Sequence, residues 1–135
     1  MIKHEEEVKE WLKIANDDYG AAKYLFGKKQ SKPLEIICYH CQQCAEKSFK
    51  AYLCSKGVEI PKTHGLKFLC HRCADFQAAF TNFFEDCEDL EVYATKARYP
   101  SLIEIEEINA KTALRQARLI FNFVSKLLED EMGMN

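Results

Sequence analysis

The stretch CYHCQQCAEKSFKAYLCSKG, residues 38–57, contains four of the seven cysteines of the chain and decides how its fold is interpreted. A free cysteine often serves as a small apolar residue in a protein core. At 100° per residue, one side of a helix collects Leu34, Ile37, Cys38, Cys41, Cys44, Ala45, Ser48, Phe49 and Tyr52. The spacing therefore predicts a helix that begins at Pro33, runs to Ser55, buries this stripe and stops at Gly57.

The cysteine pairs CQQC (residues 41–44) and CHRC (residues 70–73) keep a second interpretation open, because two such pairs often ligate zinc. A four-cysteine site would make this a zinc-stabilised interaction protein. Both pairs, however, lie within helical periodicity and not in a tight turn. Neutral thiols are also far easier to bury than thiolates that have no metal. We expect a cysteine-lined core in which Cys41, Cys44, Cys70 and Cys73 hold no metal, and no cofactor.

Apolar residues recur at helical spacing along most of the chain, and no segment alternates like a half-buried strand. Residues 91–102 lack a sustained period and contain Pro100, which predicts a connector. Further helices are expected over Glu5–Phe26, from Thr63 through Cys73, over Phe76–Leu90, and from between Ser101 and Glu106 to about Glu129. The fold class is an all-α, up-and-down antiparallel bundle of about five helices, in a single domain over residues 1–135.

Composition and charge exclude several classes of protein. The net charge is -2, from 19 basic and 21 acidic residues, so any affinity for nucleic acid has to come from a local patch. The charged N-terminus lacks the apolar region of a signal peptide, and no window approaches the ~18 apolar residues of a membrane span. We expect a cytoplasmic protein with reduced thiols and no membrane partner.

Common catalytic signatures are absent, so the candidate sites are groups of polar residues. On the predicted helix 33–55, the side opposite the stripe carries Tyr39, His40, Gln43, Glu46, Lys47 and Lys50. This side is either a solvated face with a Glu46–Lys50 ion pair or a binding site. His64 begins a helix, where it either caps and packs or belongs to a site. Arg98 suits a phosphate and Tyr99 a base, although both also suit a turn before Pro100.

Three segments, in this order and spacing, resemble the HEPN domain (higher eukaryotes and prokaryotes nucleotide-binding). They are YHCQQCAEKSFKAYLCSKG, PKTHGL and ATKARYP, which match a helix with Gln-Gln-x-x-Glu-Lys, a His-x-Leu and an Arg-Tyr-Pro. The resemblance extends over the N-terminal helix with its Trp and over the last helix. Small residues such as Ala commonly stand in that family at the places of Cys41 and Cys44, as a core position requires.

The resemblance implies a helical bundle that forms a homodimer, binds a nucleotide or RNA, and is often encoded beside a minimal nucleotidyltransferase in toxin–antitoxin pairs. The residues that it marks as the nucleotide or phosphate site are Glu46, Lys47, Lys50, His64, Arg98 and Tyr99.

Active HEPN ribonucleases use an Arg followed four to six residues later by a His. In this chain Arg98 is followed by YPSLIEIE, and neither Arg72, Arg115 nor Arg118 has such a His. No catalytic residue is therefore expected, and the favoured reading is a non-catalytic binding dimer. A HEPN ribonuclease or toxin that works without the motif is the alternative.

Overall fold

The computed structural model describes residues 2–62, 65–98 and 104–133, apart from some side chains near the edges of these ranges. Every regular element in them is helical, as the sequence predicts. The elements are α1 (Ile2–Phe26), α2 (Leu34–Ser55), α3 (Leu66–Ala74), a 3₁₀ helix η1 (Ala78–Phe83), α4 (Phe84–Arg98) and α5 (Glu107–Met132). The chain is an all-α bundle in which α1, α2 and α5 are the long helices.

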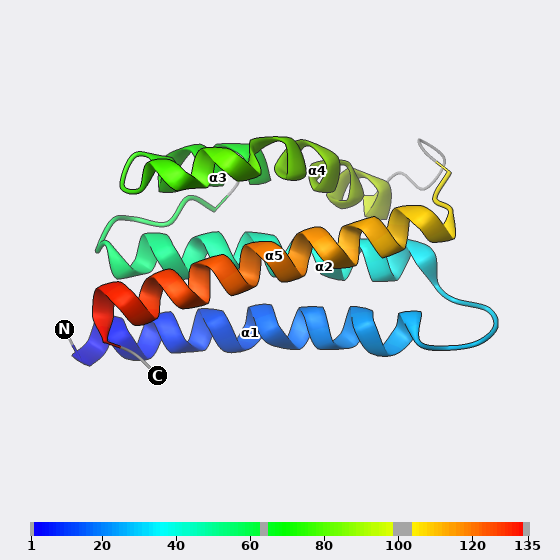
Figure 1. Cartoon of the computed structure of the whole chain (residues 1–135), viewed down its shortest axis with the longest axis horizontal. Helices are drawn as coiled ribbons and strands as arrows, with labels where there is room; N and C mark the ends of the chain where they lie inside the picture. The colour runs from blue at the N-terminus through cyan, green and yellow to red at the C-terminus, as the bar shows by residue number, and fades with distance from the viewer. Residues whose placement is uncertain (1, 63–64, 99–103, 134–135) are drawn as a thin grey trace.

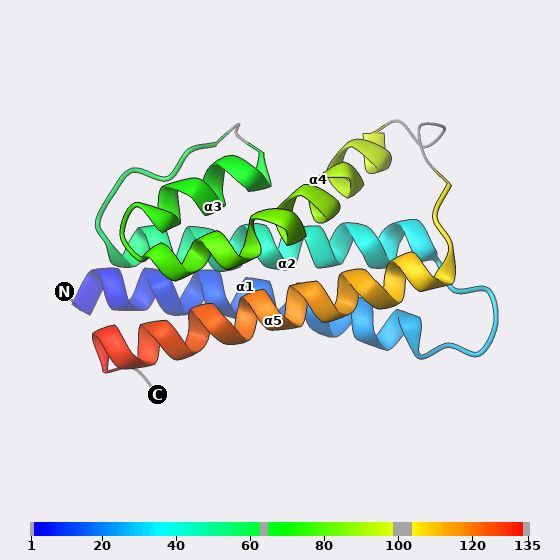
Figure 2. The same ribbon diagram turned by 45° about the horizontal axis from the view of Figure 1, so that its top comes forward.

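Helix α2 is the centre of the bundle. It packs against α1, α3, α4 and α5. Helices α1 and α2 run antiparallel, α5 crosses in front of them, and both ends of the chain lie at the same end of the molecule (Figure 1). Turning the molecule shows α3 and α4 on one side of α2, with α1 and α5 on the other (Figure 2). Residues of α2 are therefore surrounded on most sides.

The predicted stripe of α2 is buried, with Leu34 half-buried at its start. Burial also extends beyond the stripe, to Gln42, Ala51, Leu53 and Cys54. The stripe underestimates the buried surface because helices cover α2 from more than one side. A helix that is apolar over most of its circumference is expected at the centre of a bundle.

Phe80, from η1, is fully buried and joins the two layers of the bundle. Its ring lies 6.0 Å from that of Phe49, 4.8 Å from that of Tyr52 and 5.0 Å from that of Phe123, between centroids. Aromatic pairs at such separations add to the free energy gained from burial. The turn between α3 and α4 is thereby anchored on α2 and α5.

The predicted connector over residues 91–102 is wrong for its first eight residues, because α4 continues to Arg98. The buried positions Cys87 and Leu90 are followed by the half-buried Tyr93 and Ala94, which keep the helical spacing. The pattern was hard to see because Tyr93 and Ala94 are less apolar than the Phe and Leu residues before them. Pro100 lies outside the described residues.

Helix boundaries differ by a few residues from those predicted. Helix α1 begins at Ile2 and not at Glu5, and α5 continues to Met132 beyond the predicted Glu129. Gly133 ends α5 with a φ of 70°, a left-handed conformation that favours glycine. Gly57 follows α2 with a φ of 71°, so the predicted stop at this glycine is confirmed.

Two further details concern the third and fourth predicted helices. Phe76 was expected to begin a helix, but it lies in the turn between α3 and η1 with 42% of its surface exposed. The chain breaks helical geometry there, since Gln77 is extended and its side chain accepts a hydrogen bond from the backbone of Ala79. Thr63, the expected cap of the third helix, lies outside the described residues.

Candidate functional site

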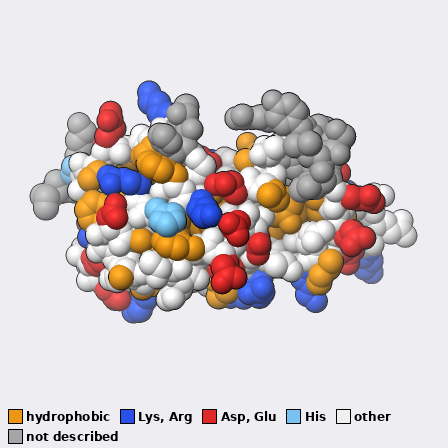
Figure 3. Space-filling view, turned by 90° about the horizontal axis from the view of Figure 1, so that it is seen from above, with side chains coloured by type: hydrophobic (Ala, Val, Ile, Leu, Met, Phe, Trp, Pro, Cys, Tyr) orange, Lys and Arg blue, Asp and Glu red, His pale blue; other side chains and the backbone are white. Residues whose placement is uncertain are grey.

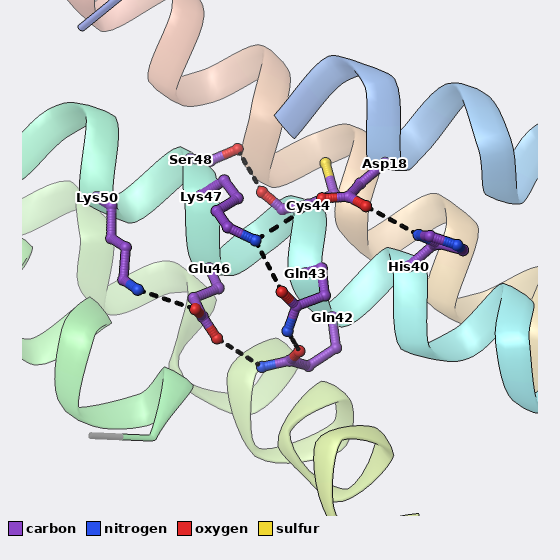
Figure 4. Close-up of polar contacts among 9 residues, drawn as sticks. All are labelled: Asp18, His40, Gln42, Gln43, Cys44, Glu46, Lys47, Ser48 and Lys50. Carbon is purple, nitrogen blue, oxygen red and sulfur yellow. Dashed lines mark hydrogen bonds and ion pairs between the residues drawn. The ribbon is translucent and has the colours of Figure 1, made fainter. Parts of the chain in front are cut away.

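The polar side of α2 is half-buried, because α1 packs along it. The side chains of Glu46, Lys47 and Lys50 are 21%, 18% and 13% exposed. Lys50 pairs with Glu46, and Lys47 lies near Asp18 of α1 (Figure 4). The structure thus brings together three of the six predicted site residues.

A chain of hydrogen bonds connects these residues along two turns of α2 (Figure 4). Lys47 Nζ donates to Gln43 Oε1 at 2.7 Å, and Gln43 Nε2 donates to Gln42 Oε1 at 2.7 Å. Gln42 Nε2 donates to Glu46 Oε1 at 3.4 Å, and Lys50 Nζ donates to Glu46 Oε2 at 3.0 Å. The Gln-Gln-x-x-Glu-Lys segment and Lys50 form one network, which we call the α2 network.

Asp18 of α1 completes the network from the neighbouring helix. Its Oδ1 lies 2.8 Å from His40 Nδ1, and its Oδ2 lies 3.9 Å from Lys47 Nζ. Asp18 was not predicted as a site residue. One feature of the sequence could have indicated it: Asp18 lies about one helical turn from Ala15 and from Ala22, which are both buried. This spacing puts its carboxylate at the edge of the core.

The charges of the α2 network are nearly balanced, since the carboxylates of Asp18 and Glu46 face the ammonium groups of Lys47 and Lys50. Each ammonium still has unused donors, because a lysine carries three N–H groups and makes one short hydrogen bond here. Lys50 also lies 5.5 Å above the centre of the Trp11 ring. A phosphate oxygen could accept the remaining N–H groups.

A hollow of about 260 Å³ lies beside Trp11, lined by Glu7, Glu10, Trp11 and Ile14. The indole ring of Trp11 thus contributes both to this hollow and to the contact with Lys50. The arrangement places one aromatic face, two carboxylates and one ammonium close together. Such a set can pack against a flat, polar ring and hold its charged substituent.

The cysteines are buried, as the core interpretation expects. The thiols of Cys44, Cys70 and Cys73 face the backbone carbonyls of Ala117, Phe80 and Phe49, at 4.0, 3.4 and 3.6 Å. Burial raises the pKa of Cys44 to about 12. The protonated thiol is therefore the stable form at neutral pH. Within residues 2–62, 65–98 and 104–133, no group of three or more His, Cys, Asp or Glu side chains could hold a metal ion.

A second polar cluster lies between α4 and α5. Gln116 is buried, with 3% of its surface exposed, and its Nε2 donates to Asp86 Oδ1 at 3.1 Å and to Asp89 Oδ2 at 3.0 Å. A hollow of about 380 Å³ adjoins it, lined in part by Asp89, Tyr93 and Gln116. This cluster was not predicted, because a buried Gln in an apolar stripe gives no sequence signal of its partners.

The remaining predicted site residues stay untested. His64 and Tyr99 lie outside the described residues, and Arg98 is described only as the last backbone position of α4. None of the described helices is long and apolar enough to span a membrane.

The family of the chain follows from comparison with known proteins. The HEPN domain family matches residues 8–127, from α1 to α5. The chain belongs to the HEPN domain family. A solved HEPN structure, titled "Crystal Structure of ST0689, an archaeal HEPN homologue", is similar with a TM-score of 0.70 and 25% sequence identity. The match covers 90% of this chain and 97% of that one. None of the curated proteins that were compared matches it.

Proposed function

We propose that this HEPN domain is a homodimeric, non-catalytic module that binds the phosphate of a nucleotide or an RNA. We further propose that it works in the cytoplasm with a minimal nucleotidyltransferase, as one member of a toxin–antitoxin type pair. The observation that carries the proposal is the α2 network, in which the Gln-Gln-x-x-Glu-Lys residues of the family motif share one set of hydrogen bonds.

The network supports phosphate binding through position and charge. Lys47 is held by Gln43 at 2.7 Å, and Lys50 by Glu46 at 3.0 Å, so both ammonium groups are fixed before a ligand arrives. Fixed donors lose little conformational entropy on binding. Their low exposure also weakens competition from water, which strengthens a charge-assisted hydrogen bond to phosphate.

The absence of the Arg-x4-6-His motif supports the proposal of binding without cleavage. No Arg of the chain is followed at four to six residues by a His, and binding needs only cations and donors. Arg98 and Tyr99 remain proposed ligand contacts, together with His64 and Glu46.

The test is isothermal titration with ATP and with a short RNA. The double variant Lys47→Gln, Lys50→Gln removes both ammonium groups of the α2 network. The control Lys13→Gln, Lys67→Gln removes two lysines that also pair with acids, Asp17 and Glu88, but on other surfaces. We expect the first variant to lose at least about tenfold in affinity, as charged hydrogen bonds imply, and the control to bind like the wild type.

Either of two results would count against the proposal: no binding heat with ATP or RNA, or equal affinity of the two double variants. The variant Arg98→Ala extends the test to the Arg-Tyr-Pro segment. Light scattering tests the dimer, and co-purification with a nucleotidyltransferase encoded next to this chain tests the partner. A monomer, or the failure of the two chains to co-purify, would remove the corresponding part of the proposal.

A further inference from the structure

Most of the described cations that form no ion pair lie on one surface. Among the described side chains, nine lysines and arginines form ion pairs with carboxylates: Lys9, Lys13, Lys32, Lys47, Lys50, Lys56, Lys67, Arg72 and Lys126. Seven others have no such partner in the described part of the chain. Lys29 and Lys62 lie in the loops after α1 and α2, and the other five lie on α1, α5 and the turn after α1: Lys23, Lys28, Lys111, Arg115 and Arg118. We call these five the α1–α5 cations.

The α1–α5 cations line two hollows that adjoin neighbouring residues of α1. The first, of about 410 Å³, is lined by Tyr19 and by residues of α5 that include Lys111, Arg115 and Arg118. The second, of about 590 Å³, is lined by Gly20, Lys23, Tyr24, Gly27 and Lys28. Tyr19 and Gly20 are consecutive, so the two hollows adjoin neighbouring residues of α1. A Cβ added at Gly20 would meet nothing within 4 Å, so the surface is open there.

Aromatic rings alternate with the cations on this surface. Tyr24 is 79% exposed, the largest exposure among the exposed apolar and aromatic residues of the described chain. Tyr19, which lines the first hollow, is half-buried. Cations beside exposed rings are the combination with which proteins hold single-stranded nucleic acids.

The opposite side of the bundle is acidic. Residues 84–95 of α4 contain five acidic residues and no basic one, namely Glu85, Asp86, Glu88, Asp89 and Glu91. Seen from above, several acidic side chains gather near the middle of the molecule, and Lys and Arg side chains lie along the lower edge, where α5 runs, as well as over the left half (Figure 3). The net charge of -2 therefore conceals an uneven distribution of charge. An uneven distribution can orient a polyanion toward the more cationic side before contact.

We propose that the α1–α5 surface binds the backbone of single-stranded RNA, with Lys111, Arg115 and Arg118 on consecutive phosphates and Tyr24 stacked on a base. At 1.5 Å of rise per residue, these three cations span about 10 Å along α5, the reach of two to three nucleotides. The surface is distinct from the α2 network, and it rests on the proposed function for the nature of the ligand. In this proposal the α2 network binds one phosphate, and the α1–α5 surface binds several consecutive phosphates of a polynucleotide.

The test is fluorescence anisotropy of a labelled 12-mer oligouridylate, measured at several salt concentrations. The variant is Lys111→Gln, Arg115→Gln, Arg118→Gln. The matched control is Lys9→Gln, Lys13→Gln, Lys126→Gln, which removes three exposed cations from the same two helices, each of them ion-paired. Circular dichroism checks that both triple variants keep their helices, and Lys23→Gln, Lys28→Gln serves as an independent second variant.

We expect the α5 triple variant to bind RNA at least about tenfold more weakly. Its plot of log affinity against log salt should be shallower by about 2, since each lost phosphate contact on a single strand contributes about 0.7. Tyr24→Ala should weaken binding at least about fivefold without changing that slope. The control should match the wild type.

Equal RNA affinity of the two triple variants would overturn this inference and leave the proposed function intact. Binding of ATP but not of RNA by the wild type would likewise overturn this inference and leave the proposed function intact. A wild type that binds neither ligand would overturn both. Binding to phosphatidylserine vesicles that depends on the α5 cations, without binding to RNA, would assign the surface to membranes and overturn the inference as well.

Discussion

The variant Cys41→Ala separates a cysteine-lined core from a metal site. Cys41 is fully buried, and burial raises the pKa of its thiol well above the ordinary range. Replacing it with Ala removes about one methylene equivalent, worth about 0.8 kcal/mol of transfer free energy. The cavity left behind adds about 0.5 kcal/mol at 24 cal/mol per Å³ for roughly 20 Å³. The free energy of unfolding should therefore fall by about 1–2 kcal/mol.

A zinc ligand would behave very differently. Structural zinc contributes about 10–16 kcal/mol, which matches or exceeds the whole stability of about 5–15 kcal/mol of a typical domain. Losing one of four ligands would then unfold the chain. Cys54→Ala is the matched control, because Cys54 is 4% exposed and belongs to neither cysteine pair.

Urea unfolding followed by circular dichroism measures the difference, with and without a chelator, beside elemental analysis of the purified protein. We expect Cys41→Ala and Cys73→Ala to cost about as much as Cys54→Ala, and the chelator to have no effect. The reasoning is refuted if the first two variants are unfolded while the control is folded, or if stoichiometric zinc is found.

Three further predictions concern pH and buried polar groups. Burial raises the pKa of Cys38 and of Cys44 to about 12 from an ordinary value of 9.0, so the stability that these thiols contribute is complete below pH 9 and falls as the pH rises toward 12. The free energy of unfolding, measured with urea at pH 8, 9 and 10, should decline less in the double variant Cys38→Ala, Cys44→Ala than in the wild type. The difference should reach up to about 1.4 kcal/mol per pH unit for each thiol. Equal declines in the two proteins would contradict the burial argument. Gln116→Leu leaves two aspartates without their shared donor and should lower the free energy of unfolding, measured with urea, by about 1–3 kcal/mol. Gln116→Glu places a third carboxylate beside them, so its loss of stability relative to the wild type should shrink below about pH 5. A loss in Gln116→Glu that does not change with pH would exclude carboxylate repulsion as its source. Asp18→Asn should cost about 1 kcal/mol in thermal unfolding, and an unchanged midpoint would mean that its pairs with α2 are not formed in solution.

The helices could be predicted because each buries a stripe with the period of a helix. The stripe of α2 and the stop at Gly57 required only the local sequence. The end of α4 was missed because Tyr93 and Ala94 continue the stripe with residues of weak apolar character. Burial of α2 beyond its stripe could not be predicted from α2 alone, since it depends on how many helices surround it.

The candidate site was predictable only in the part that lies on one helix. Glu46, Lys47 and Lys50 share a face of α2 by spacing. Their partner Asp18 lies on another helix, and its contact with His40 spans 22 residues of sequence. The α1–α5 surface combines segments that are separated by most of the chain, and an overall charge of -2 gives no indication of it.

The central claim is that this HEPN domain binds a phosphate-bearing ligand through its lysine and arginine side chains. An NMR titration tests this claim most directly. Amide and side-chain resonances are assigned, and a short single-stranded RNA is added stepwise. We expect the largest shifts at Lys47 and Lys50 of α2 and along residues 111–118 of α5, with little change along the acidic residues 85–91 of α4. Shifts confined to α4, or none at all at saturating RNA, would contradict the account.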